Sequence, residues 1–156
     1  MNTLTRIENQ LRRGLEGEAW HGPAVFELLS GISPEQAHIQ PVPGAHSIWE
    51  IVLHLAGAYR LVLRRLRGDR VPYTPEEDWP PVPEPSAEQW RKTCDELKNL
   101  NLEIRKSVLA FDVNLLDQPL VADVPYTAYT QFVGLTQHDL YHAGQIALLK
   151  RLLTRS

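Results

Sequence analysis

The chain has 156 residues, enough for one domain of ordinary size, and we expect a single domain over residues 1–156. Its 16 basic and 19 acidic residues give a net charge of -3 and are spread along the sequence, which leaves no basic face for nucleic acid. The single cysteine, Cys94, excludes an internal disulfide, and no uncharged run reaches the roughly twenty residues that cross a bilayer. With no signal-peptide pattern, we expect a cytoplasmic protein without nucleic-acid or membrane partners.

The N-terminal region predicts a helix that is broken or kinked at Gly22-Pro23. Gly31 and Ser33-Pro34 are expected to end this helix, and residues 39–45 to form a loop. Apolar residues with helical spacing precede the break and resume after it: Leu4, Ile7, Leu11, Leu15, Val25, Phe26, Leu28 and Leu29.

A second helix is predicted to begin at Ser47 and to last until Gly68. Ser47 followed three residues later by Glu50 is a capping box, in which each side chain bonds the other residue's backbone N–H. A wide apolar face follows, formed by Ile48, Ile51, Val52, Leu55, Tyr59, Val62 and Leu66.

Six prolines lie between Pro72 and Pro85, and this segment is expected to be a stiff connection without helix or central strand. Ser86 is the expected N-cap of a third helix. Residues 112–125 form a second predicted connection, and the last helix is predicted from Thr127 to Leu153.

Four amphipathic helices predict the all-α class and a four-helix bundle. A proline-rich linker spans about 3.1 Å per residue and could run the length of the bundle, whereas an antiparallel neighbour needs only a short turn. We therefore predict a long crossover between the second and third helices, in the order up-down-down-up.

The last predicted helix contains a histidine pair, His138 and His142, at i and i+4. This spacing aims two imidazoles at the same point, as in half of a helical metal site. The pair belongs to a seam that should face the bundle core, formed by Leu135, His138, His142, Gln145, Leu149 and Leu152. Buried imidazoles without partners cost about 1 to 3 kcal/mol each, so a bound metal ion is a good explanation for them.

His54, at the edge of the buried face of the second helix, is the candidate for a third ligand. Gly57 lies three residues after His54, and Gly134 lies four before His138. Glycine inside a helix costs about 1 kcal/mol relative to alanine, so these small residues indicate either a cavity beside the ligands or close helix packing.

Three neutral imidazoles would leave the ion its positive charge and an open coordination position, which is typical of a catalytic site. Either a bound hydroxide or a bound thiolate could then act as nucleophile. Glu50 and Gln145 are candidates for orienting ligands or substrate, and Tyr141 for packing or for orienting substrate. No acid or base is assigned. His138 to His142 is similar in pattern to the H-E-x-x-H of zinc proteases, but the acid is Asp139, and we reject a protease.

Two groups of motifs carry a family resemblance: Ser47-Ile48-Trp49-Glu50 leading to His54-Leu55-Ala56, and Gln137 to Ile146. The chain resembles the DinB/YfiT-like superfamily of metal-binding four-helix proteins. The resemblance implies a crossover bundle, a homodimer and one divalent ion, zinc or nickel, on His54, His138 and His142. It also implies a low-molecular-weight thiol as a possible cosubstrate, because characterised relatives include thiol-dependent transferases and isomerases.

Two functions remain open from the sequence. The first is a metal-dependent hydrolase or a thiol transferase that acts on a small molecule through the three histidines. The second is a non-catalytic, metal-stabilised dimeric protein with an interaction or stress-response role.

Overall fold

The computed structural model describes residues 1–154, which contain helices and no strand. The all-α prediction is therefore confirmed. The elements are α1 (Thr3–Glu16), α2 (Val25–Leu29), α3 (Pro34–His38), α4 (Ile48–Leu66), α5 (Pro75–Asp78), α6 (Ala87–Leu109), the 3-10 helix η1 (Val113–Leu115) and α7 (Ala128–Leu153). No helix within the described chain combines the length and apolar character that a membrane crossing requires.

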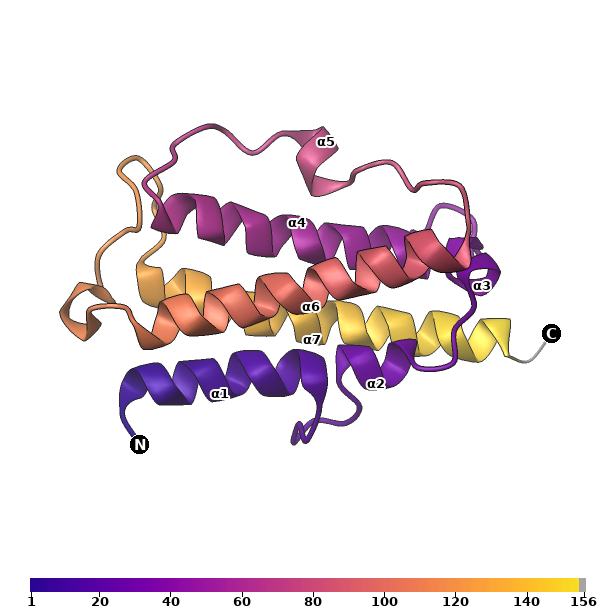
Figure 1. The fold of residues 1–156 in the computed structure, drawn as a ribbon, viewed down its shortest axis with the longest axis horizontal. Helices are drawn as coiled ribbons and strands as arrows, with labels where there is room; N and C mark the ends of the chain where they lie inside the picture. Colours follow the sequence, from indigo (N-terminus) through magenta and orange to yellow (C-terminus); the bar gives the residue numbers. More distant parts are fainter. Residues whose placement is uncertain (155–156) are drawn as a thin grey trace.

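The long helices α1, α4, α6 and α7 lie side by side (Figure 1). α4 contacts α6 and α7, and α1 contacts the same two helices. α4 and α6 run in the same direction, whereas α1 and α7 run in the opposite one. The chain between α4 and α6, residues 67–86, returns along the length of α4 and carries α5 (Figure 1).

Side-chain caps lie at the starts of α4, α6 and α7. The Ser47 hydroxyl accepts from the Glu50 N–H, and the Glu50 carboxylate accepts from the Ser47 N–H at 2.6 Å. Thr127 caps α7 through the N–H of Thr130, and Ser86 caps α6. All three predicted starts are confirmed.

The predicted break at Gly22-Pro23 comes earlier in the structure. α1 ends at Glu16, and Gly17 follows with a φ of 137°. A Cβ on Gly17 would lie 3.2 Å from the carboxyl carbon of Glu27, and that carboxylate accepts from the N–H of Ala24. Gly17 therefore both turns the chain and leaves room for the acid that caps α2.

Two short helices occupy segments where none was predicted. Ser33 caps α3 through Gln36, and Thr74 caps α5 through Glu77. Each helix starts with a proline, which lacks an N–H but loses nothing at the first helical position, where that N–H would have no intrahelical partner. The expectation that residues 72–85 contain no helix was therefore wrong, because one helical turn, α5, lies within this segment.

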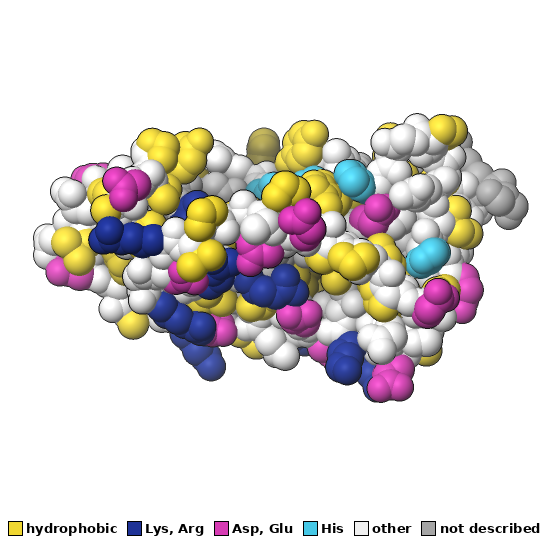
Figure 2. Space-filling model, turned by 90° about the horizontal axis from the view of Figure 1, so that it is seen from above, with side chains coloured by type: hydrophobic (Ala, Val, Ile, Leu, Met, Phe, Trp, Pro, Cys, Tyr) yellow, Lys and Arg dark blue, Asp and Glu magenta, His cyan; other side chains and the backbone are white. Residues whose placement is uncertain are grey.

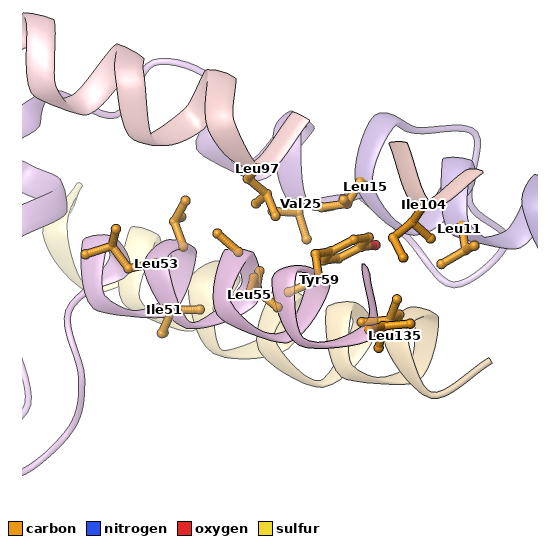
Figure 3. Close-up of a cluster of buried hydrophobic side chains, with 14 of the residues drawn as sticks. Leu11, Leu15, Val25, Ile51, Leu53, Leu55, Tyr59, Leu97, Ile104 and Leu135 are labelled. Carbon is orange, nitrogen blue, oxygen red and sulfur yellow. The ribbon is translucent and has the colours of Figure 1, made fainter. Parts of the chain in front are cut away.

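The hydrophobic core lies between the four long helices (Figure 3). Its fully buried side chains come from each of them and include Leu11, Leu15, Leu55, Tyr59, Leu97, Ile104, Phe132 and Ile146. At about 25 cal/mol per Å² of apolar surface, this burial is the main source of stability for the protein.

A polar chain of hydrogen bonds crosses this core. The Tyr59 hydroxyl donates to Oδ2 of Asp139 at 2.7 Å, and Asn101 donates to the Tyr59 oxygen and to the Leu11 carbonyl, both at 3.1 Å. Asp139 is fully buried, and its hydrogen bond to Tyr59 joins α7 to α4. Burial raises the pKa of Asp139 well above its usual value, although the Tyr59 hydrogen bond opposes the rise.

We predict that Asp139→Asn stabilises the protein increasingly as the pH rises. The folded state keeps the Asp139 proton where the unfolded state releases it, above a pKa of about 4. The wild type should therefore lose stability with rising pH, by up to about 1.4 kcal/mol per pH unit, and an amide removes this loss. Urea unfolding at several pH values from 4 to 8 measures the difference, with the exposed Asp117→Asn as control. A difference that does not change with pH would contradict the prediction.

Candidate metal centre

His54 from α4 and His138 and His142 from α7 meet in the structure. Nε2 of His138 lies 2.8 Å from Nε2 of His54 and 3.1 Å from Nε2 of His142. One nitrogen from each of the three rings lies within 4.8 Å of the others. His54 and His142 are buried and His138 is half-buried, so the structure brings the three predicted ligands together beneath the surface.

The outer nitrogens of two rings face acceptors. Nδ1 of His54 donates to the Asp78 carbonyl oxygen at 2.8 Å and lies 3.0 Å from the Asp78 carboxylate. Nδ1 of His142 donates to Oε1 of Gln145 at 2.7 Å. Because these contacts place a hydrogen on each Nδ1, the Nε2 atoms of the neutral rings carry lone pairs that point toward the centre.

The surroundings of His138 and His142 favour the neutral form of these two rings. Burial, with the neighbouring His142 and His54, lowers the pKa of His138 to about 4. Burial also lowers the pKa of His142, against the opposing effect of the Gln145 hydrogen bond. Neutral imidazole is the form that binds metal ions.

The residues present fit a metal ion better than a hydrogen-bond network. A proton on Nε2 of His138 would be the only donor for two acceptor nitrogens, those of His54 and His142. Tetrahedral metal–nitrogen bonds of about 2.0–2.1 Å separate their nitrogens by roughly 3.3 Å. Nε2 of His138 lies at comparable distances, 2.8 and 3.1 Å, from Nε2 of His54 and of His142. One cation would satisfy all three lone pairs. Nδ1 of His138 is buried without a partner among the described residues in either case.

The linker between α4 and α6 covers the His54 side of the site. The indole of Trp79 is parallel to the His54 ring at a centroid distance of 4.0 Å, and its other face stacks on His46 at 3.5 Å. Seen from the linker side, histidine and hydrophobic side chains lie next to each other at the surface (Figure 2). Sequence reasoning missed Asp78, which contacts His54 from the linker, because a proline-rich linker has no periodicity that relates its side chains to a helix face.

Glu50 and Tyr141, both candidates for the pocket, have different neighbours in the structure. The Glu50 carboxylate bonds Ser47 and Gln40 and lies 3.4 Å from Nδ1 of His46. Its pKa is shifted upward by burial but is lowered overall by these hydrogen bonds. Tyr141 is exposed, with its ring centroid 5.0 Å from that of His142. Gln145, also predicted to orient a ligand or substrate, accepts a hydrogen bond from the candidate ligand His142.

The two glycines proposed to mark a cavity differ in their surroundings. A Cβ on Gly57 would clash with the Tyr73 hydroxyl and lie 2.8 Å from the carbonyl oxygen of Glu77. The space beside Gly57 is therefore filled by the linker, which replaces the cavity and helix-packing explanations at this position. A Cβ on Gly134 would meet nothing within 4 Å, so Gly134 marks no close approach.

Comparison with known proteins identifies the family. No curated protein and no solved structure matches the chain. A family model, that of the DinB superfamily, matches residues 19–146, a span that contains the three candidate metal ligands and the linker between α4 and α6. This match confirms the resemblance carried by the histidine motifs, and the chain belongs to the DinB superfamily.

Proposed function

We propose that the protein binds one divalent metal ion, zinc or nickel, through Nε2 of His54, His138 and His142, and that it uses the ion to activate water or a low-molecular-weight thiol. The substrate would be a small molecule, and the protein a metal-dependent hydrolase or a thiol transferase. The observation that carries this proposal is the convergence of three imidazole nitrogens, with the rings of His54 and His142 held from outside by hydrogen bonds. We also propose that the four long helices form an up-down-down-up bundle around this site.

The chemistry follows from the donor set. A divalent ion held by three neutral imidazoles keeps its charge, lowers the pKa of a bound water to about 7 and favours the thiolate form of a bound thiol. The protein's own residues orient the donors: Gln145 holds the His142 ring, and Asp78 holds the His54 ring. Trp79 covers His54 and limits the access of water to that ligand.

The closed character of the site favours a second candidate function. His54 is 9% exposed and His142 is 4% exposed, and the linker lies over them. A structural ion in such a site would stabilise the bundle of a non-catalytic interaction or stress-response protein. Metal removal would then lower the melting temperature strongly, while a screen of thiols, electrophiles and hydrolysable esters would detect no reaction.

We predict about one metal ion per chain in protein purified without a histidine tag, and loss of the ion in His54→Ala, His138→Ala and His142→Ala. Each substitution leaves only two imidazole donors, fewer than the three protein ligands of a catalytic zinc site. Elemental analysis measures the ion, and circular dichroism should show retained helix content. His21→Ala, on an exposed loop residue, is the matched control and should retain the metal. Full retention in His142→Ala would contradict the assignment.

We predict that Gln145→Ala weakens metal affinity by about 10- to 100-fold, because the His142 ring loses the acceptor that fixes its tautomer and orientation. Gln145→Glu should restore affinity, since a carboxylate also accepts from Nδ1. Competition with a chromophoric chelator measures both variants, and the exposed Gln137→Ala on the same helix is the control. Equal affinities for wild type and Gln145→Ala would show that the hydrogen bond has no part in binding.

A further inference from the structure

We propose that residues 73–79, here called the strap, are a positioning element for the metal site, and that docking of the strap on α4 and binding of the ion promote each other. This inference rests on the proposed metal binding and adds how the site is assembled and controlled. The strap contributes no metal ligand. It acts through His54, the only one of the three histidines that comes from α4.

Gly57 provides the place where the strap docks. The Tyr73 hydroxyl donates to the Glu77 carbonyl oxygen at 2.9 Å, and these two oxygens occupy the space that a side chain at position 57 would need. Thr74 caps the single turn of α5, which brings Tyr73 and Glu77 together. The strap therefore approaches α4 closely only because this helix position has no Cβ.

Arg64, two turns after Gly57, fastens the linker to the same helix. Its guanidinium donates to the Glu77 carboxylate at 2.6 Å, to the Asp69 carboxylate at 2.8 Å and to the Val71 carbonyl oxygen at 3.2 Å. Such partly exposed ion pairs are each worth about 0 to 1 kcal/mol, so they guide the strap without locking it in place.

The far end of the strap sets the orientation of His54. Asp78 accepts from Nδ1 of His54 through its carbonyl oxygen, and Trp79 lies flat against the same ring. A rotation of the imidazole about its Cβ–Cγ bond would break both contacts. The orientation that they maintain is the one that directs Nε2 toward His138.

The strap can separate from α4 while the bundle stays folded. Thr74, Pro75 and Glu76 are exposed, and α5 packs against α4. Segments with few buried contacts open locally at a lower free energy than the whole domain. Because energetic coupling is reciprocal, a strap that orients His54 for the ion must itself be held down by the ion.

The first test compares zinc affinities by chelator competition in strap variants of the full chain. Gly57→Ala displaces Tyr73 and Glu77, and Trp79→Ala removes the stack on His54. Both should weaken zinc binding by about 10- to 100-fold, the usual effect of losing an outer-layer contact to a ligand. Gly134→Ala makes the same chemical change on α7 where a Cβ meets nothing, and should stay within about twofold of the wild type.

The second test follows cleavage after the exposed Glu76 by a glutamate-specific protease, with mass spectrometry to identify the site. Zinc should slow this cleavage at least about tenfold in the wild type. It should not slow it in His138→Ala, which loses the ion but keeps every strap contact described above. Gly57→Ala should be cleaved faster than the wild type even without zinc.

The outcomes separate this inference from the proposed function. Wild-type zinc affinity in Gly57→Ala, together with faster cleavage after Glu76, would overturn the role of the strap and leave the three-histidine site standing. If the wild type binds zinc but zinc does not slow cleavage after Glu76, the role of the strap is likewise overturned and the three-histidine site stands. Binding of neither zinc nor nickel by the wild type would overturn both proposals. If Gly57→Ala fails to fold, the zinc affinity of Trp79→Ala decides the role of the strap, because Trp79 lies in the linker outside the four long helices.

Discussion

The convergence of three imidazole nitrogens between α4 and α7 places the strictest demand on this structure, because it requires two helices to hold one relative register. The caps at Ser47 and Thr127 set where each helix begins, and thus how far along it the histidines lie. Apolar packing alone tolerates small shifts between helices, since it is not directional. A contact between specific atoms, such as Nε2 of His54 and His138, tolerates few.

The buried Asp139 network meets part of this demand. It joins α7 to α4 through Tyr59, continues to α6 through Asn101 and reaches the backbone of α1 at Leu11. Asp139 is the residue next to His138, so the polar contacts that join all four long helices are anchored beside a metal-ligand candidate. Hydrogen bonds in a low-dielectric core are costly to leave unmade, which makes such a network a strong restraint on register.

The sequence was most informative where a local pattern has one structural meaning. The capping residues located the helices, the i, i+4 spacing located His138 and His142, and the buried face of the second helix suggested His54. The pattern of α7 did not reveal that Asp139 faces the core. The residues around it were used to define the face that carries His138 and His142, and Asp139 does not belong to that face. The strap was beyond local reasoning, since its contacts join residues 24 positions apart, as between His54 and Asp78.

Gly57 shows why a local cost can be a tertiary requirement. Glycine within a helix lowers stability by about 1 kcal/mol relative to alanine. From the sequence, the two explanations for Gly57 were a cavity beside the ligands and close helix packing. In the structure the missing Cβ admits Tyr73 and Glu77, and the strap in turn delivers Asp78 and Trp79 to His54. A helical acceptor such as Gln145 is fixed for as long as α7 is folded, whereas an acceptor on a strap is present only while the strap is docked. The ring of His54 is therefore the point at which the affinity of this site can change without unfolding the bundle.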